Sequence, residues 1–179
     1  MSVDEPVIDV LFSEAEIAAR VETLAGEIAG AQNGELLIVV ILKGSFVFAA
    51  DLIRALDRAG VAPQVDFMTL SSYGVGTRSS GVVRLTRDLS EDVGDRHILI
   101  VDDILESGRT LAAARDMMLD RGAASVLTCL LLDKAEKRVL PIEADFKGFV
   151  IGDRFVVGYG LDLAHRFRGL PYIGVVRQD

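Results

Sequence analysis

The residues of this chain that could do chemistry are densest in one segment, which reads ILIVDDILESGRTL over residues 98–111. Three carboxylates, those of Asp102, Asp103 and Glu106, come directly before a loop that contains hydroxyls, a glycine and an arginine. A glycine-containing turn that leads into a helix offers unpaired backbone N–H groups and the positive end of the helix dipole, which together bind phosphate. The carboxylates would repel that phosphate, so they need hydroxyl groups, a metal ion or a proton. The segment therefore predicts a ligand that carries a phosphate, a polyhydroxylated ring and a divalent cation.

The residues around this segment predict how it is positioned. The apolar run from Ile98 to Val101 is typical of a strand buried on both faces, as in a parallel sheet. Asp102 and Asp103 stand where we expect that strand to end, and we expect a helix to begin near Leu111. Ligands of open α/β sheets bind at this end of the strands. This order of features favours a binding site over a solvated acidic turn.

A second strand-to-helix connection with polar residues at its corner lies earlier in the chain. From Glu35 the sequence reads ELLIVVILKGSFVFAADLIRAL, which predicts an apolar strand, a turn at Lys43, Gly44 and Ser45, and a helix to about Arg58. A tight connection would explain that turn as well as a binding role would. Other expected elements are a capped helix from Ser13 to about Gly30, a helix at 111–121, strands at 64–70, 82–86, 125–132, 149–151 and 172–176, and a polar loop at 71–81.

Composition limits the class of protein. The 179 residues suffice for one domain, 1–179, with a sizeable core. No apolar run reaches the ~18 residues of a membrane-spanning helix, and the acidic start lacks the pattern of a secretory signal, so we expect a soluble, cytoplasmic protein. The single cysteine, Cys129, lies in an apolar run and is interpreted as a core residue. A net charge of −8 disfavours nucleic acid as a partner.

The segment VDDILESGRTL resembles the phosphoribosyl-diphosphate (PRPP) binding motif of the type I phosphoribosyltransferases. The resemblance implies a single-domain α/β fold with a central, mainly parallel sheet flanked by helices. It also implies a small hood subdomain, contributed by the N-terminal residues and about 145–179, and a homo-oligomer, either a dimer or a tetramer. Asp102 and Asp103 would hold the ribose hydroxyls and Mg²⁺. The 5-phosphate would lie on the backbone and hydroxyls of Glu106, Ser107, Gly108, Arg109 and Thr110.

The general base of the family would be Glu106, which takes the proton from N7 of the purine. Here the sequence departs from the family, because the usual residue at this position is aspartate. Glutamate is one methylene longer and would need a different rotamer to reach the same proton.

Other segments resemble the hypoxanthine-guanine branch of this family. ILKGSFVFAADL resembles its pyrophosphate-contacting loop, which implies roles for Lys43 and Gly44 and a cis peptide bond between Leu42 and Lys43. The pair Ser72 and Tyr73 resembles part of the flexible loop that closes over the site.

Two later segments resemble the purine-binding part of the same branch. LLDKAEKR implies that Lys134 donates to the 6-oxo group of the purine and that Arg138 contacts pyrophosphate. GDRFVVGYGLD implies that Phe155 stacks on the base, that the backbone of Val156 reads its edge, and that Asp162 holds a second magnesium. Arg168 matches a further pyrophosphate contact.

The resemblance therefore implies an enzyme of purine salvage that transfers the phosphoribosyl group of PRPP to hypoxanthine, guanine or both and releases pyrophosphate. The side chains do not distinguish hypoxanthine from guanine. One alternative is a phosphoribosyltransferase for xanthine, adenine or a pyrimidine. Another is an RNA-binding regulator with the same fold, like the pyrimidine-operon attenuation proteins, whose motif also reads V-D-D-x-L-x-x-G-R-T. The acidic composition disfavours that regulator.

Overall fold

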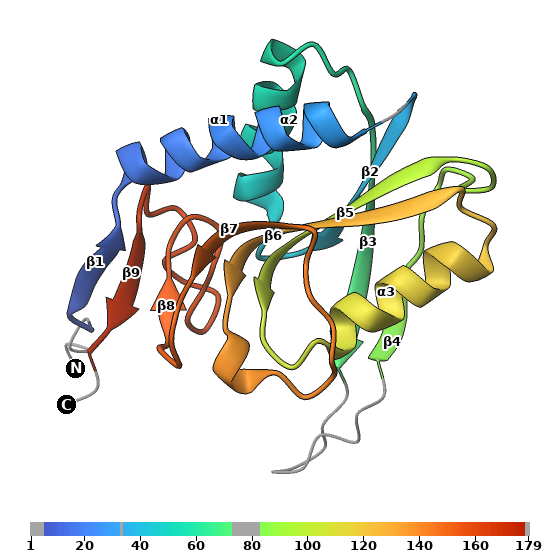
Figure 1. Cartoon of the computed structure of the whole chain (residues 1–179). Helices are drawn as coiled ribbons and strands as arrows, with labels where there is room; N and C mark the ends of the chain where they lie inside the picture. Colours follow the sequence, from blue (N-terminus) through green and yellow to red (C-terminus); the bar gives the residue numbers. More distant parts are fainter. Residues whose placement is uncertain (1–5, 33, 73–82, 178–179) are drawn as a thin grey trace.

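The larger of two sheets forms the centre of the molecule, a computed structural model that describes residues 6–32, 34–72 and 83–177 (Figure 1). In spatial order its strands are β4 (Val83–Arg87), β3 (Gln64–Ser72), β2 (Leu36–Leu42), β5 (His97–Leu105), β6 (Ser125–Asp133) and β7 (Phe146–Val150). All neighbouring strands run parallel except β3 and β4. This topology confirms the predicted mainly parallel α/β class.

The chain winds outward from the middle of this sheet in both directions. β2 is followed by its neighbour β3 on one side, whereas β5 is followed by β6 on the other. Such a reversal of strand order leaves a crevice at the carboxyl ends of the two central strands. Lys43 and Gly44 come directly after β2, and residues 102–110 span the end of β5. Both predicted corners therefore meet at one crevice.

Helices cover both faces of the sheet, which explains the uninterrupted apolar runs of the central strands. Helices α1 (Glu14–Ala31) and α2 (Phe46–Arg58) pack on one face, and α3 (Arg109–Asp120) packs on the other (Figure 1). Ile38 and Val40 belong to the cluster under α1 and α2, whereas Leu37 and Val39 belong to the cluster under α3. Alternate residues of one strand thus enter two cores, so every position must be apolar.

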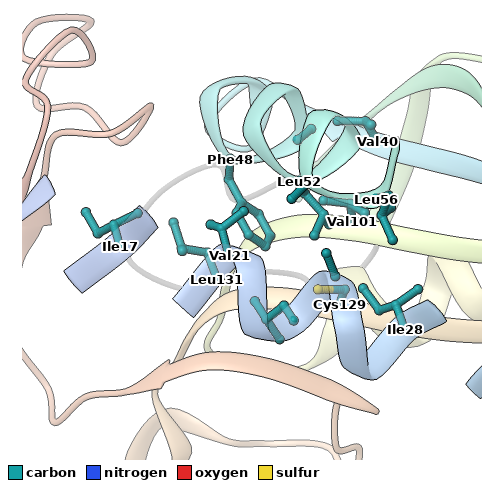
Figure 2. Packing of buried hydrophobic residues seen from close by; sticks show 14 of the residues in the cluster. Ile17, Val21, Ile28, Val40, Phe48, Leu52, Leu56, Val101, Cys129 and Leu131 are labelled. Carbon is teal, nitrogen blue, oxygen red and sulfur yellow. The ribbon is translucent and has the colours of Figure 1, made fainter. Parts of the chain in front are cut away.

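The core under α1 and α2 is drawn in close-up in Figure 2. Ile17 of α1 and Phe48 of α2 are among its large, almost fully buried side chains, and Cys129 of β6 lies in the same cluster. Burial raises the pKa of the Cys129 thiol, which keeps it protonated. This confirms the interpretation of Cys129 as a core residue.

The first helix begins with the predicted capping box. The Ser13 hydroxyl accepts a hydrogen bond from the Glu16 backbone N–H at 3.3 Å, and the Glu16 carboxylate accepts one from the Ser13 N–H at 2.8 Å.

The strand predicted at 149–151 is wrong in its limits, because β7 begins at Phe146, where it pairs with Cys129 of β6. Lys147 and Gly148 interrupt the apolar run there and hid the first half of the strand.

A smaller antiparallel sheet joins the two ends of the described chain. Its strands lie in the order β1 (Ile8–Phe12), β9 (Ile173–Val176) and β8 (Val156–Val157). Because β7 belongs to the larger sheet, the smaller sheet takes only β8 and β9 from the C-terminal part of the chain. β1 and β8 were not predicted from the sequence, because no residue of β1 is fully buried and β8 has only two residues.

None of the helices in the described parts of the chain is both long enough and apolar enough to cross a membrane.

Candidate active site

Two adjoining hollows open at the crevice between β2 and β5. The first lobe, of about 480 Å³, is lined mainly by residues 102–111 together with Lys43 and Gly44. The second lobe, of about 430 Å³, is lined by Lys134 and by residues of the segment from Phe155 to Arg168. Both lobes share Lys43, Gly44, Asp103 and Glu106, so a ligand can extend from one into the other. The predicted phosphate–sugar residues thus lie in one lobe and the predicted base residues in the other.

Asp102 and Asp103 lie within β5 and not after its end, so the predicted end of this strand at Val101 is wrong. β5 continues to Leu105 because β6 stays alongside it, with Asp102 opposite Leu130. On its other side β2 ends at Leu42, which exposes one edge of β5 to the first lobe. The two carboxylates are therefore held by a strand of the sheet.

Burial dominates the electrostatics of this aspartate pair. Asp102 is only 8 % exposed, and its burial, reinforced by the charge of Asp103, raises the pKa of Asp102 well above its usual range. Burial also raises the pKa of Asp103, although hydrogen bonds from its surroundings oppose the shift. A buried and a half-buried carboxylate side by side favour a bound cation or hydroxyl donors, which would stabilise their charged forms.

The donors at this pair fit Mg²⁺ in the way that it binds with phosphate ligands. Mg²⁺ is commonly held by one or two carboxylates, with substrate oxygens and water completing its shell. Among the described residues no group of three or more His, Cys, Asp or Glu side chains is close enough to hold a metal alone. Asp162 does not join Asp102 and Asp103 in such a group. Its carboxylate contacts Arg168 at 2.7 Å and accepts a hydrogen bond from the His165 backbone N–H at 2.7 Å.

The loop after β5 presents its amides to the first lobe. The Glu106 carbonyl accepts a hydrogen bond from Arg138 Nη1 at 2.9 Å, and the Ser107 carbonyl accepts from the N–H groups of Val139 and Leu140, each at 3.0 Å. In a trans peptide the next residue's N–H points away from the carbonyl. The N–H groups of Ser107 and Gly108 therefore point away from the 138–140 segment.

The helix after this loop begins two residues earlier than predicted, at Arg109 and not near Leu111. Gly108 caps it with a φ of 83°, a left-handed conformation in which glycine is favoured. A Cβ at Gly108 would also lie 2.5 Å from Cγ2 of Ile142. The early start brings the N-terminal amides of α3 to the lobe, where Arg109 and Thr110 line the wall.

The turn after β2 is in direct contact with the aspartate pair. A Cβ on Gly44 would lie 1.6 Å from Oδ2 of Asp103, so only glycine fits between the turn and this carboxylate. The peptide bond between Leu42 and Lys43 is cis, as the resemblance implies. Ser45 is buried and its hydroxyl donates to the Ile41 carbonyl, which ties the turn to the end of β2. These contacts favour a binding role for the turn over a plain connection.

An ion pair between Lys134 and Glu106 lines the second lobe. Lys134 is 5 % exposed, and its Nζ lies 2.7 Å from Oε1 of Glu106. Phe155 is 46 % exposed at the rim, and the buried Val156 follows it. An ammonium, a carboxylate and an open aromatic face around one hollow can bind a flat heterocycle that has acceptor and donor atoms on one edge.

Arg138 lies beside the loop at residues 106–110 and lines neither lobe. Besides its bond to the Glu106 carbonyl, its guanidinium forms an ion pair with Asp133, which is almost fully buried. These contacts support the shape of the loop and leave the predicted pyrophosphate contact of Arg138 without support from its position.

The structure adds residues to the site that sequence analysis did not single out. Gly160 and Leu161 lie where the Phe155–Arg168 segment turns back, and Leu161 lines the second lobe. The two glycines around Tyr159 were the signal for this turn, because φ is 93° at Gly158 and 99° at Gly160.

β3 ends at Ser72, whereas Tyr73 and most of the predicted loop at 71–81 lie outside the described residues.

A family profile described as the phosphoribosyl transferase domain matches residues 8–163. The chain therefore belongs to the phosphoribosyltransferase family. More particularly, it is 45 % identical over 171 residues to the hypoxanthine-guanine phosphoribosyltransferase of Streptococcus pneumoniae strain R6, covering 95 % of this chain and 93 % of the relative. It is 43 % identical over 172 residues to the hypoxanthine phosphoribosyltransferase of Escherichia coli K12, covering 94 % and 95 %.

Solved structures agree with these relatives. A crystal structure of a hypoxanthine phosphoribosyltransferase from Staphylococcus aureus matches with a TM-score of 0.89 at 39 % identity, covering 94 % of this chain and 91 % of that one. A Trypanosoma cruzi hypoxanthine phosphoribosyltransferase, studied for the role of its C-terminal region in oligomeric state and activity, matches with a TM-score of 0.90 at 39 % identity, covering 97 % and 93 %. The predicted family and fold class are confirmed.

Replacing Asp102 by asparagine should stabilise the protein while it weakens PRPP binding. A carboxyl whose pKa is raised by folding lowers stability once the pH rises above its unfolded pKa, about 3.9 for aspartate. Asp102→Asn should therefore raise the unfolding midpoint at pH 7, and the gain should vanish below about pH 4. Thermal unfolding of the wild-type and Asp102→Asn proteins between about pH 3 and pH 7 measures this difference in midpoint.

The matched control is Asp116→Asn, which removes the same charge from an exposed position on α3. A gain at pH 7 that is equal in both variants, or one that persists at pH 3, would contradict the assigned burial effect.

Proposed function

We propose that this phosphoribosyltransferase transfers the 5-phosphoribosyl group of PRPP to a 6-oxopurine, hypoxanthine and guanine being the expected bases. The observation that supports this most is the junction of the two lobes at Glu106. An amide-lined loop and the Asp102–Asp103 pair lie on one side of it, and Lys134 and Phe155 lie on the other. A nucleotide has the same order of groups, from phosphate through sugar to base.

The phosphate end of the ligand is assigned to the first lobe. The 5-phosphate accepts hydrogen bonds from the amides of residues 107–110, and Arg109 adds positive charge to that wall. Asp102 and Asp103 accept hydrogen bonds from the ribose hydroxyls and would hold Mg²⁺, which would supply positive charge to the leaving pyrophosphate. Lys43 and Arg168, which line the second lobe together, hold the pyrophosphate from the other side.

Departure of pyrophosphate leaves positive character on the anomeric carbon of the ribose. The carboxylates of Asp102 and Asp103 stabilise that charge from a fixed strand without attacking it. Residues 73–81, which would cover this position in the family, lie outside the described residues. Exclusion of water by that segment is part of the proposal.

The incoming base is oriented by the pair of Lys134 and Glu106. Nζ of Lys134 donates to Oε1 of Glu106 at 2.7 Å. A 6-oxopurine replaces Glu106 as the acceptor for the buried Lys134 ammonium, and the released Glu106 carboxylate takes the proton from N7. The longer side chain of glutamate lets it contact both partners. Adenine has a 6-amino group, which donates where Lys134 also donates, so it is rejected.

Replacing Glu106 by glutamine should lower turnover by about 10² to 10⁴, since general bases contribute rate factors of that size. The amide cannot accept the N7 proton but keeps the length of the side chain. PRPP binding should remain nearly unchanged, because the loop contributes backbone amides to the phosphate. Steady-state rates with hypoxanthine, together with calorimetric titration of PRPP, measure both parts.

Glu136→Gln, on the exposed turn at residues 135–137, is the control and should retain the wild-type rate. An unchanged rate for Glu106→Gln would remove Glu106 from the role of base.

The choice of base is tested by incubating the protein with Mg²⁺, PRPP and single bases and measuring pyrophosphate release. Hypoxanthine and guanine should give rapid release, and adenine and uracil should give little, because only a 6-oxopurine accepts from Lys134 and presents N7 to Glu106. Xanthine, which also has the 6-oxo group, tests the remaining alternative. A titration with uridine-rich hairpin RNA at several salt concentrations completes the test. Tight RNA binding without pyrophosphate release would favour the regulator instead.

We also propose that the chain forms a homo-oligomer, on the basis of its similarity to the family. Light scattering coupled to size-exclusion chromatography distinguishes a dimer or tetramer from a monomer.

A further inference from the structure

The turn at Gly158–Gly160, which follows β8, lies against the backbone of the Lys43–Gly44 turn. A Cβ on Gly160 would lie 2.1 Å from the carbonyl oxygen of Gly44. On the opposite side Gly44 touches the Asp103 carboxylate, as described above. Gly44 therefore lies in contact with both Asp103 and Gly160. Because neither glycine has a side chain that could adjust, a shift of Gly160 would shift the backbone of Gly44.

The same turn holds Arg168 in place. Arg168 Nη1 donates to the Gly160 carbonyl at 2.7 Å, and the Gly160 N–H donates to the Arg168 carbonyl at 2.9 Å. A movement of Gly160 would therefore move both the Gly44 wall and the Arg168 guanidinium, which line the second lobe together.

Tyr159 fixes this turn from behind. It is 6 % exposed and has a φ of 49°, a left-handed conformation that is unfavourable for tyrosine and that its surroundings must hold. Its hydroxyl donates to Oδ2 of Asp51 at 2.6 Å, and its N–H donates to the Leu170 carbonyl at 2.9 Å. Burial and the Asp51 hydrogen bond both raise the pKa of Tyr159, so the hydroxyl stays protonated and remains a donor.

Asp51 belongs to the helix that carries the other side of the contact. α2 begins at Phe46, directly after the Lys43–Gly44 turn, and Asp51 lies little more than one helical turn further on. The helix therefore holds Gly44 at its beginning and Tyr159 through Asp51. Because both the Lys43–Gly44 turn and Tyr159 are attached to α2, this helix fixes the distance between the Lys43–Gly44 turn and the Gly158–Gly160 turn.

We propose that Tyr159 and Asp51 are positioning residues that set the gap between the Gly44 turn and Arg168, and so the affinity for the pyrophosphate end of PRPP. The inference rests on the proposed function. Neither side chain touches the reacting atoms. Lys134 follows β6, and Phe155 is separated from Tyr159 by β8, which pairs with β9, so these purine contacts should respond little.

The test uses the intact protein and its Tyr159→Phe variant, which keeps the ring and loses the hydroxyl. Loss of one hydrogen bond should raise KM for PRPP about three- to tenfold. KM for hypoxanthine should stay within about twofold. Calorimetric titration with magnesium pyrophosphate, without any base, should show the same three- to tenfold loss of affinity, about the value of one hydrogen bond. This second readout does not depend on turnover.

Asp51 supplies the conservative variants. Asp51→Asn retains an oxygen that can accept from Tyr159 and should behave like wild type, whereas Asp51→Ala should match Tyr159→Phe. Tyr159→Phe and Asp51→Ala both remove the Tyr159–Asp51 hydrogen bond, and Asp51→Ala also removes the exposed ion pair of Asp51 with Arg54. Because the shared hydrogen bond can be lost only once, the double variant should bind magnesium pyrophosphate no more weakly than the more impaired single variant. Tyr172→Phe removes a hydroxyl from a half-buried tyrosine outside this contact and serves as the control.

The inference is overturned if Tyr159→Phe lowers the unfolding midpoint and leaves magnesium pyrophosphate binding unchanged, or if both KM values rise together. The proposed function fails in a different way. In that case the wild-type protein itself releases no pyrophosphate from PRPP with any base.

Discussion

The site depends on two neighbouring carboxylates held by a strand of the central sheet. Asp102 and Asp103 belong to β5, which is flanked by β6 beyond the point where β2 has ended. The apolar residues before them are fixed by two cores, one on each face of the sheet. The position of the carboxylates is therefore set by a central strand, although the burial of Asp102 is unfavourable for its charged form.

Glycine at two places allows the remaining groups to approach this pair. Gly44 brings the turn after β2 against Asp103, and Gly108 turns the chain so that α3 begins at the lobe. In both cases a side chain would collide with neighbouring atoms. Backbone amides and carbonyls can then form much of the wall, which suits a ligand rich in phosphate oxygens.

In the proposed mechanism, the pair of Lys134 and Glu106 accounts for a glutamate where the family usually has aspartate. A buried ammonium without a partner is unfavourable, and the Glu106 carboxylate lies 2.7 Å from Nζ of Lys134. Glu106 itself is 49 % exposed at its side chain, so it can change rotamer. We propose that the extra methylene allows one carboxylate to serve both the Lys134 ammonium and N7 of the base.

Sequence analysis predicted the features that depend on consecutive residues and did not predict those that depend on pairing across the fold. The loop at 106–110 was predicted because its strand, acids, glycine and helix follow one another. The ion pair of Lys134 with Glu106 joins residues 28 positions apart and depends on the register of β5 with β6. Arg138 was assigned to pyrophosphate from the resemblance of LLDKAEKR to the family, whereas the direction of its side chain depends on its contacts with Glu106 and Asp133 in the folded chain. β1 forms only because β9, from the other end of the chain, lies beside it.

The central claim is that one nucleotide spans both lobes, with its phosphate on the amides after Glu106 and its sugar on Asp102 and Asp103. A crystal structure of the wild-type protein grown with inosine 5′-monophosphate, magnesium and pyrophosphate tests this directly. The account predicts the phosphate within hydrogen-bonding distance of the amides of residues 107–110, the ribose hydroxyls facing the Asp102–Asp103 pair, and the base against Phe155 with its 6-oxo group on Lys134. A nucleotide bound with its phosphate outside the first lobe, or with Asp102 and Asp103 turned away from its ribose and from magnesium, would contradict it.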